Sequence, residues 1–138
     1  MARLLGIDPG ARRCGVAVTD SDETMAFPRP ALVNNDQLIV ALRTLVEEEN
    51  VALVVTGRPV ALSGRKTAST HDADALFTSL VDGLAPVPVV QWDERLTTHE
   101  AQRSLSQAGV KAREQRQFVD SAAAVVMLQS YLDAQRED

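Results

Sequence analysis

Three carboxylates stand where secondary-structure elements are expected to begin or end. Asp8 follows a short apolar run at residues 4–7, Glu94 follows another at residues 87–92, and Asp120 precedes a stretch with helical apolar spacing. Sites in open α/β sheets form outside the carboxyl ends of the strands. We therefore expect Asp8 and Glu94 at one rim if their strands are parallel neighbours, with Asp120 brought there by the last helix.

Such a group of acids has a chemical use. Carboxylates at one rim repel one another and resist desolvation unless a cation lies among them. Hard divalent cations such as Mg²⁺ and Mn²⁺ take oxygen ligands, and two ions roughly 4 Å apart can stabilise both the attacking and the leaving oxygen of a phosphodiester displacement. No cluster of His and Cys competes, because His71 and His99 are far apart in the sequence. The three acids are therefore candidates for the metal site of a nuclease.

Each acid alone also has a structural alternative. Asp8 precedes Pro9-Gly10, and Asp commonly begins turns. Glu94 could form a surface ion pair with Arg95, its neighbour in the sequence. Asp120 could be the N-cap of the last helix.

The spacing of apolar residues predicts the elements that would position these acids. Runs at residues 4–7 and 14–19 predict a hairpin. Its Pro9-Gly10 turn is expected to take a negative and then a positive φ. Residues 25–33 predict a third strand, which Pro28 and Pro30 restrict to an edge or make irregular.

Helices and strands then alternate along the chain. Helices are expected from Asn35 or Asp36 to about Glu49, at about 69–84, at about 98–108 and from Asp120 onward, with strands at 52–55 and 87–92. This order predicts an α/β fold in which helices cover a mixed sheet. With 138 residues and no linker-like segment, the chain is expected to form one domain over residues 1–138.

The charge pattern leaves nucleic acid as an eligible partner. The net charge of −5 is unusual for a nucleic-acid binder, but local potential steers a phosphate backbone whatever the total. Basic residues gather in two stretches with few acids, 58–70 and 95–116. The alternative is an ordinary solvated surface. The candidate phosphate contacts in these stretches are Arg58, Arg65, Lys66, Arg95 and Arg113.

Composition also bears on location. No apolar run approaches the roughly 20 residues that cross a bilayer, and the first residues do not resemble a signal peptide, so we expect a cytoplasmic protein without a membrane partner. The single cysteine, Cys14, lies in an apolar stretch and is expected to be buried. A thiol that links two chains is the alternative.

Several motifs, in their order and spacing, resemble the YqgF-type family, whose members are described as Holliday junction resolvases or ribosomal RNA precursor nucleases. The similarity covers essentially the whole chain, and the Asp-Glu-Arg-Leu-Thr-Thr string is its most specific part. The motifs are Gly6-Ile7-Asp8-Pro9-Gly10, Arg12-Arg13-Cys14-Gly15-Val16-Ala17, Gly57-Arg58-Pro59, Asp93-Glu94-Arg95-Leu96-Thr97-Thr98 and Val119-Asp120-Ser121-Ala122-Ala123.

The resemblance implies an RNase H-like fold with a five-stranded mixed sheet whose first three strands are antiparallel. It implies that Asp8, Glu94 and Asp120 bind two Mg²⁺ or Mn²⁺ ions. The chain departs from the family pattern at Arg58, where Leu is usual, and at Ser121, where Lys is frequent. The loop after Pro59 also differs, so the substrate contacts between Arg58 and Thr67 are the least secure part of the resemblance.

Several functions are compatible with these features. The first is maturation of the small-subunit ribosomal RNA precursor, and the alternative is resolution of branched DNA by a symmetric homodimer with two active sites. A protein that binds nucleic acid without cutting it would not need all three acids. ATP-using enzymes with a similar opening hairpin need two such domains, and the sequence has no Gly-x-x-x-x-Gly-Lys loop.

Replacement of Asp120 by Asn separates a helix cap from a metal ligand. A cap contributes roughly 1 kcal/mol and Asn caps nearly as well as Asp, so a cap alone would leave activity and stability almost intact. As a metal ligand, Asp120→Asn should lower turnover in Mg²⁺ by orders of magnitude while the metal-free melting temperature barely moves. Mn²⁺ should restore part of the activity, because it binds mixed nitrogen and oxygen sites more tightly than Mg²⁺. Near-normal turnover in Mg²⁺ would reduce Asp120 to a cap.

Overall fold

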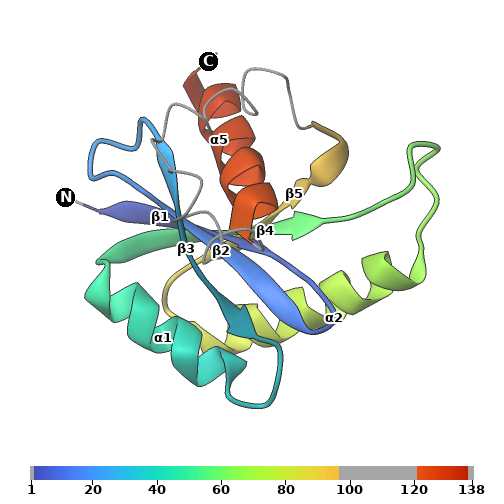
Figure 1. The fold of residues 1–138 in the computed structure, drawn as a ribbon, viewed down its shortest axis with the longest axis horizontal. Coiled ribbons are helices and arrows are strands. Elements are labelled where there is room, and N and C mark those ends of the chain that lie inside the picture. The colour runs from blue at the N-terminus through green and yellow to red at the C-terminus, as the bar shows by residue number, and fades with distance from the viewer. Residues whose placement is uncertain (1, 97–120, 137–138) are drawn as a thin grey trace.

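The computed structural model describes residues 2–96 and 121–136 (Figure 1). In this described part, a five-stranded sheet carries two helices on one face and one helix on the other. None of the helices in the described part is both long enough and apolar enough to span a membrane. In chain order the elements are β1 (Arg3–Asp8), β2 (Arg13–Thr19), β3 (Ala26–Val33), α1 (Leu38–Glu48), β4 (Val51–Arg58), α2 (Ala68–Gly83), β5 (Val89–Asp93), the short 3₁₀ helix η1 (Glu94–Leu96) and α5 (Ala122–Arg136).

The strand order is β3-β2-β1-β4-β5. β1, β2 and β3 pair antiparallel, whereas β4 lies parallel to both β1 and β5. This is the mixed sheet with three antiparallel strands that the resemblance implied. β1, β3, β4 and β5 consequently all end at one edge of the sheet, which we call the carboxyl edge.

The alternation of side chains along the strands builds two cores. Leu5 and Ile7 of β1 face α1 and α2, where they pack with Leu42 and Leu80. Leu4 faces α5. On that second face a side chain at Gly6 would collide with the helix, because a Cβ there would lie 2.9 Å from Cβ of Leu128. Cys14 is fully buried in the first core, as expected, and is a free thiol.

Two local expectations are corrected. The Pro9-Gly10 turn does not place Gly10 at positive φ; among the described glycines only Gly64 has one. Gly10 is needed for space instead, since a Cβ there would lie 2.3 Å from the carbonyl oxygen of Arg13. At the start of α1 the N-cap is Gln37 without a side-chain bond, although the Asn35 side chain accepts from its backbone N–H at 2.9 Å.

The other element expectations are met within a few residues. Residues 26–33 form an edge strand despite Pro28 and Pro30, and α1, α2, β4 and β5 lie where the apolar spacing placed them. The helix expected at 98–108 lies outside the described residues.

The start of α5 is tied to the sheet by a buried hydroxyl. The register of β2 against β3 shifts between the pairs Cys14–Leu32 and Val16–Arg29. At this irregularity the Ser121 hydroxyl accepts from the Val16 backbone N–H at 3.0 Å and donates to the Arg29 carbonyl at 2.6 Å. Ser121 is fully buried. The hydroxyl therefore bridges two strands at the shift and fixes the first turn of α5.

Removal of this hydroxyl tests the tie. Ser121→Ala leaves a buried N–H and a partly buried carbonyl without this partner, which should lower the free energy of unfolding by about 1–3 kcal/mol. Ser79→Ala is the matched control, because Ser79 lies on the exposed side of α2 and bonds only to the Ala75 carbonyl of its own helix. Urea unfolding of the metal-free proteins measures both changes. Equal stabilities of the two variants would contradict the tie.

Candidate active site

The carboxyl edge brings Asp8 and Glu94 together, as the sequence predicted, but not through neighbouring strands. β4 lies between β1 and β5. The parallel pair Ile7–Thr56 sets Asp8 of β1 level with Gly57 of β4, and Gly57 in turn pairs with Trp92 of β5. The condition of adjacent strands was therefore wrong, and the two acids meet across an intervening strand.

Gly57 makes this contact possible. A Cβ at position 57 would lie 2.5 Å from Oε1 of Glu94, so the Glu94 carboxyl occupies the space above the glycine. From there it reaches Asp8, to which its protonated form donates a hydrogen bond. The alternation of side chains puts Asp8, Gly57 and Glu94 on the face of the sheet that α5 covers. The missing side chain of Gly57 is thus part of the site, which the sequence alone did not suggest.

The electrostatics of the pair call for a cation. Burial raises the pKa of Glu94 to about 8, with further contributions from the hydrogen bond to Asp8 and from the negative charges of Asp8 and Asp93. Within residues 2–96 and 121–136, no Lys or Arg forms an ion pair with Asp8 or Glu94. Two carboxylates in contact without a counter-charge provide the oxygen donors that Mg²⁺ or Mn²⁺ prefers. The described residues thus fit two ligands of a divalent metal site.

The described residues contain two of the three predicted metal ligands, Asp8 and Glu94. No set of three metal-binding side chains is present among the described residues. The third predicted acid, Asp120, lies outside them, and its role stays a prediction. The next residue, Ser121, is hydrogen-bonded to the backbone of Val16 and Arg29. Val16 follows Gly15 in β2, and Gly15 is the cross-strand partner of Asp8. The chain therefore returns to the strand beside the acid pair immediately after position 120.

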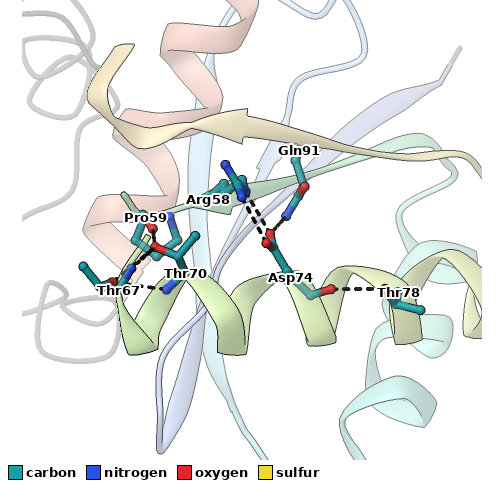
Figure 2. Close-up of polar contacts among 7 residues, drawn as sticks. All are labelled: Arg58, Pro59, Thr67, Thr70, Asp74, Thr78 and Gln91. Atoms are coloured by element: carbon teal, nitrogen blue, oxygen red, sulfur yellow. Dashed lines mark hydrogen bonds and ion pairs between the residues drawn. The ribbon is translucent and has the colours of Figure 1, made fainter. Parts of the chain in front are cut away.

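Arg58 lies on the opposite face of the sheet and is engaged in a polar network (Figure 2). Its Nε and Nη2 donate to the two carboxylate oxygens of Asp74 at 2.8 and 3.0 Å, and the side-chain amide of Gln91 donates to the same carboxylate at 3.0 Å. These bonds hold the pKa of Asp74 well below its usual range. Arg58 thereby ties the end of β4 to α2, and its predicted contact with substrate would compete with this bridge.

Three further candidate basic residues, Arg65, Lys66 and Arg95, lie around the same edge. Arg95 pairs with Asp93 at 2.6 Å, and its Nη1 lies 3.5 Å from the Cβ position of Gly64 in the loop after β4. Arg65 and Lys66 follow in that loop and are exposed. Arg113 lies outside the described residues. The structure thus brings Arg65, Lys66 and Arg95 to one side of the edge, and their contact with substrate stays a prediction.

Comparison with known proteins assigns the family. The model of the family described as "RuvX: Holliday junction resolvase" matches residues 2–134. The chain belongs to the RuvX family. This RuvX-family chain is 44% identical over 137 residues to a protein of Mycobacterium sp. (strain KMS), covering 97% of this chain and 81% of the relative. It is 47% identical over 134 residues to one of Mycobacterium tuberculosis (strain ATCC 25177 / H37Ra), covering 95% and 78%. Both relatives are named "Putative pre-16S rRNA nuclease".

Solved structures confirm the RNase H-like fold of this RuvX-family chain. Thermus thermophilus RuvC in complex with a Holliday junction substrate has a TM-score of 0.65 at 12% identity, covering 99% of this chain and 96% of that one. The Fowlpox virus resolvase bound to Holliday junction DNA has a TM-score of 0.57 at 8% identity, covering 96% and 98%. At such identities the likeness concerns the fold alone.

Further residues of this RuvX-family chain surround the site without having been predicted as site residues. A hollow of about 490 Å³ adjoins Asp8 and is lined by Arg12 of the β1–β2 turn and Arg13 at the start of β2. The signal in the sequence was the motif that begins with these two basic residues, one position after Asp8-Pro9-Gly10. Asp74 and Gln91 gave no signal, because their partnership with Arg58 depends on how α2 packs on the sheet.

The pH dependence of stability tests the acid pair. The pKa of Glu94 is raised to about 8 in the folded protein, whereas the ordinary pKa of this side chain is 4.5. Between these values the unfolded chain binds fewer protons, so the stability of the metal-free protein should fall as the pH rises. The slope is at most about 1.4 kcal/mol per pH unit, and solvent screening at the half-buried carboxyl lowers it. Glu94→Gln should flatten this part of the curve.

Thermal unfolding in EDTA between pH 5 and pH 9 provides the measurement, in roughly the range where this linkage acts. Glu48→Gln is the control, because Glu48 is exposed at the end of α1. It should keep the slope of the wild type. The acid pair would be in doubt if wild type and Glu94→Gln lost stability in parallel.

Proposed function

We propose that the chain is a divalent-metal-dependent nuclease that hydrolyses phosphodiester bonds in structured nucleic acid. The observation that carries the proposal is the contact between Asp8 and Glu94 above Gly57, without a counter-charge from the described residues. In this proposal the two carboxylates and Asp120 hold two Mg²⁺ or Mn²⁺ ions. Such ions activate a water molecule and stabilise the leaving oxygen.

Other residues of the chain would position the metal ligands and bind the substrate. Asp8 and Glu94 leave from the ends of β1 and β5, which hydrogen bonds of the sheet hold at a fixed separation across β4. Gly57 keeps the space between them open. Arg65, Lys66, Arg95 and Arg113 are the proposed contacts to the phosphate backbone. Arg58 and Arg95 are weaker candidates for this role than Arg65 and Lys66, because their guanidinium groups are already bound by Asp74 and Asp93.

Maturation of the small-subunit ribosomal RNA precursor is the physiological reaction that we favour. It is the activity that gives the relatives of 44–47% identity their name. The second candidate is cleavage of four-way DNA junctions, supported by the description of the matching family. A junction resolvase must make two cuts and would act as a symmetric homodimer, whereas a processing enzyme has no such requirement.

A cleavage assay with site variants tests the function. Wild-type protein in Mg²⁺ or Mn²⁺ should cut a small-subunit precursor RNA in preference to a four-way DNA junction. Asp8→Asn should reduce cleavage to background, because a neutral amide is a poor ligand for a hard cation. Asp22→Asn is the matched control and should cut normally, since Asp22 is exposed in the β2–β3 turn at the other edge of the sheet.

The outcomes separate the parts of the proposal. Preference for the junction, together with a dimer in solution, would favour the second candidate. Normal cleavage by Asp8→Asn would contradict the site. A wild-type protein that binds either substrate but cuts neither with any divalent metal would be a binding protein, and the proposed activity would be wrong.

A further inference from the structure

The hollow beside Asp8 has the dimensions and position of a subsite. It measures about 490 Å³ and lies between the β1–β2 turn and the end of β3. Small-ligand pockets span roughly 300–1,000 Å³, so it has room for one nucleotide unit. Because Asp8 lines the hollow and also contacts Glu94, whatever occupies it lies next to the acid pair. The described residues that line it are Asp8, Gly10, Arg12, Arg13, Gly15 and Val33.

The backbone around the hollow is fixed. The Asn34 backbone N–H donates to the Arg12 carbonyl at 2.8 Å, and its side-chain amide donates to the Gly10 carbonyl at 2.7 Å. Gly10 packs directly against the Arg13 carbonyl, where a side chain would not fit. These bonds hold the β1–β2 turn against the segment that follows β3. The backbone of Arg12 is therefore already ordered, so substrate binding loses no entropy by ordering it.

The charge of the hollow suits an anion. Among the described residues of its lining, Asp8 is the one acid, and the Arg12 side chain is exposed. Arg12 forms no ion pair with any acid of the described residues, whereas Arg58 and Arg95 at the same edge are bound by Asp74 and Asp93. A guanidinium presents a planar fork of donors that matches a phosphate group. Arg12 is therefore equipped to bind an external phosphate.

We propose that this hollow binds the phosphate adjacent to the scissile one on the strand that is cut, with Arg12 as its principal contact. The proposal rests on the nuclease function proposed above and extends it to a substrate contact, Arg12, that was not among the predicted phosphate contacts. Since RNA and DNA share the phosphodiester backbone, the contact should be indifferent to the sugar. It would fix the register of the strand and contribute no sequence preference.

Binding in EDTA tests the subsite without cleavage. Fluorescence anisotropy over a series of KCl concentrations would measure the affinity of wild type, Arg12→Ala and Arg12→Lys for a labelled RNA hairpin and a labelled four-way DNA junction. Arg12→Ala should weaken both about five- to tenfold and reduce the slope of log affinity against log salt by roughly 0.7–0.9. Arg12→Lys should retain most of the slope. Arg43→Ala on the exposed side of α1 removes the same charge and should change neither quantity.

A scan of the probe locates the contact. Single phosphates of the strand are replaced by uncharged methylphosphonates, and the cut position is mapped separately with wild-type protein and Mn²⁺. One replacement next to the cut should weaken binding by wild type and leave binding by Arg12→Ala unchanged. This double-mutant cycle isolates the pair from the general effect of charge.

The results distinguish the subsite from the function. If wild type cuts and binds but Arg12→Ala behaves like Arg43→Ala, the subsite is wrong and the nuclease stands. The subsite is equally wrong if every methylphosphonate weakens both proteins alike. A wild-type protein that neither cuts nor binds the probes overturns both proposals.

Discussion

The rest of this structure depends on the contact between the carboxyl groups of Asp8 and Glu94, whose strands are separated by β4. Asp8 and Glu94 leave strands that β4 separates, and they meet only because Gly57 presents no side chain between them. Burial, together with the hydrogen bond to Asp8 and the negative charges of Asp8 and Asp93, raises the pKa of Glu94. A sheet can maintain such a contact because its ladder of hydrogen bonds fixes the strand ends. A divalent cation would convert the repulsion into attraction, so the same geometry that strains the metal-free protein prepares a metal site.

Both faces of the sheet contribute to holding that edge. On the face of α5, Ser121 bridges β2 and β3 and sets the start of the helix beside β2. On the opposite face, Arg58 and Gln91 bind one carboxylate of α2, which joins the ends of β4 and β5 to that helix (Figure 2). A site needs its ligands placed within about 0.5 Å of productive geometry. Polar ties on both faces at the strand ends, where the ladder itself stops, supply that restraint.

The sequence predicted that Asp8 and Glu94 share one rim of the sheet, but not the contacts that bring them together. Period-two and helical apolar spacing located the five strands and α1 and α2, and the positions of Asp8 and Glu94 after apolar runs predicted their common rim. The order of strands could not be obtained from spacing, so β4 was not expected between the acids. The requirement for glycine at position 57 depends on a residue 37 positions later in the chain. The position of the buried Ser121 hydroxyl at the β2–β3 register shift likewise depends on how α5 packs on the sheet, which local sequence propensity does not report.

The distribution of charge explains how a chain of net charge −5 can offer a basic edge to phosphate. The β2–β3 turn and the end of α1 lie at the edge where β1 begins, and they carry Asp22, Glu23, Glu47 and Glu48. A strand of six residues, such as β1, spans about 20 Å, whereas the Debye length at physiological ionic strength is about 8 Å. Exposed acids at the far edge are therefore screened from a ligand at the carboxyl edge. There Asp74 and Asp93 are each paired with an arginine, so among the described residues the field that a nucleic-acid strand meets is set mainly by the acid pair and by Arg12, Arg65 and Lys66.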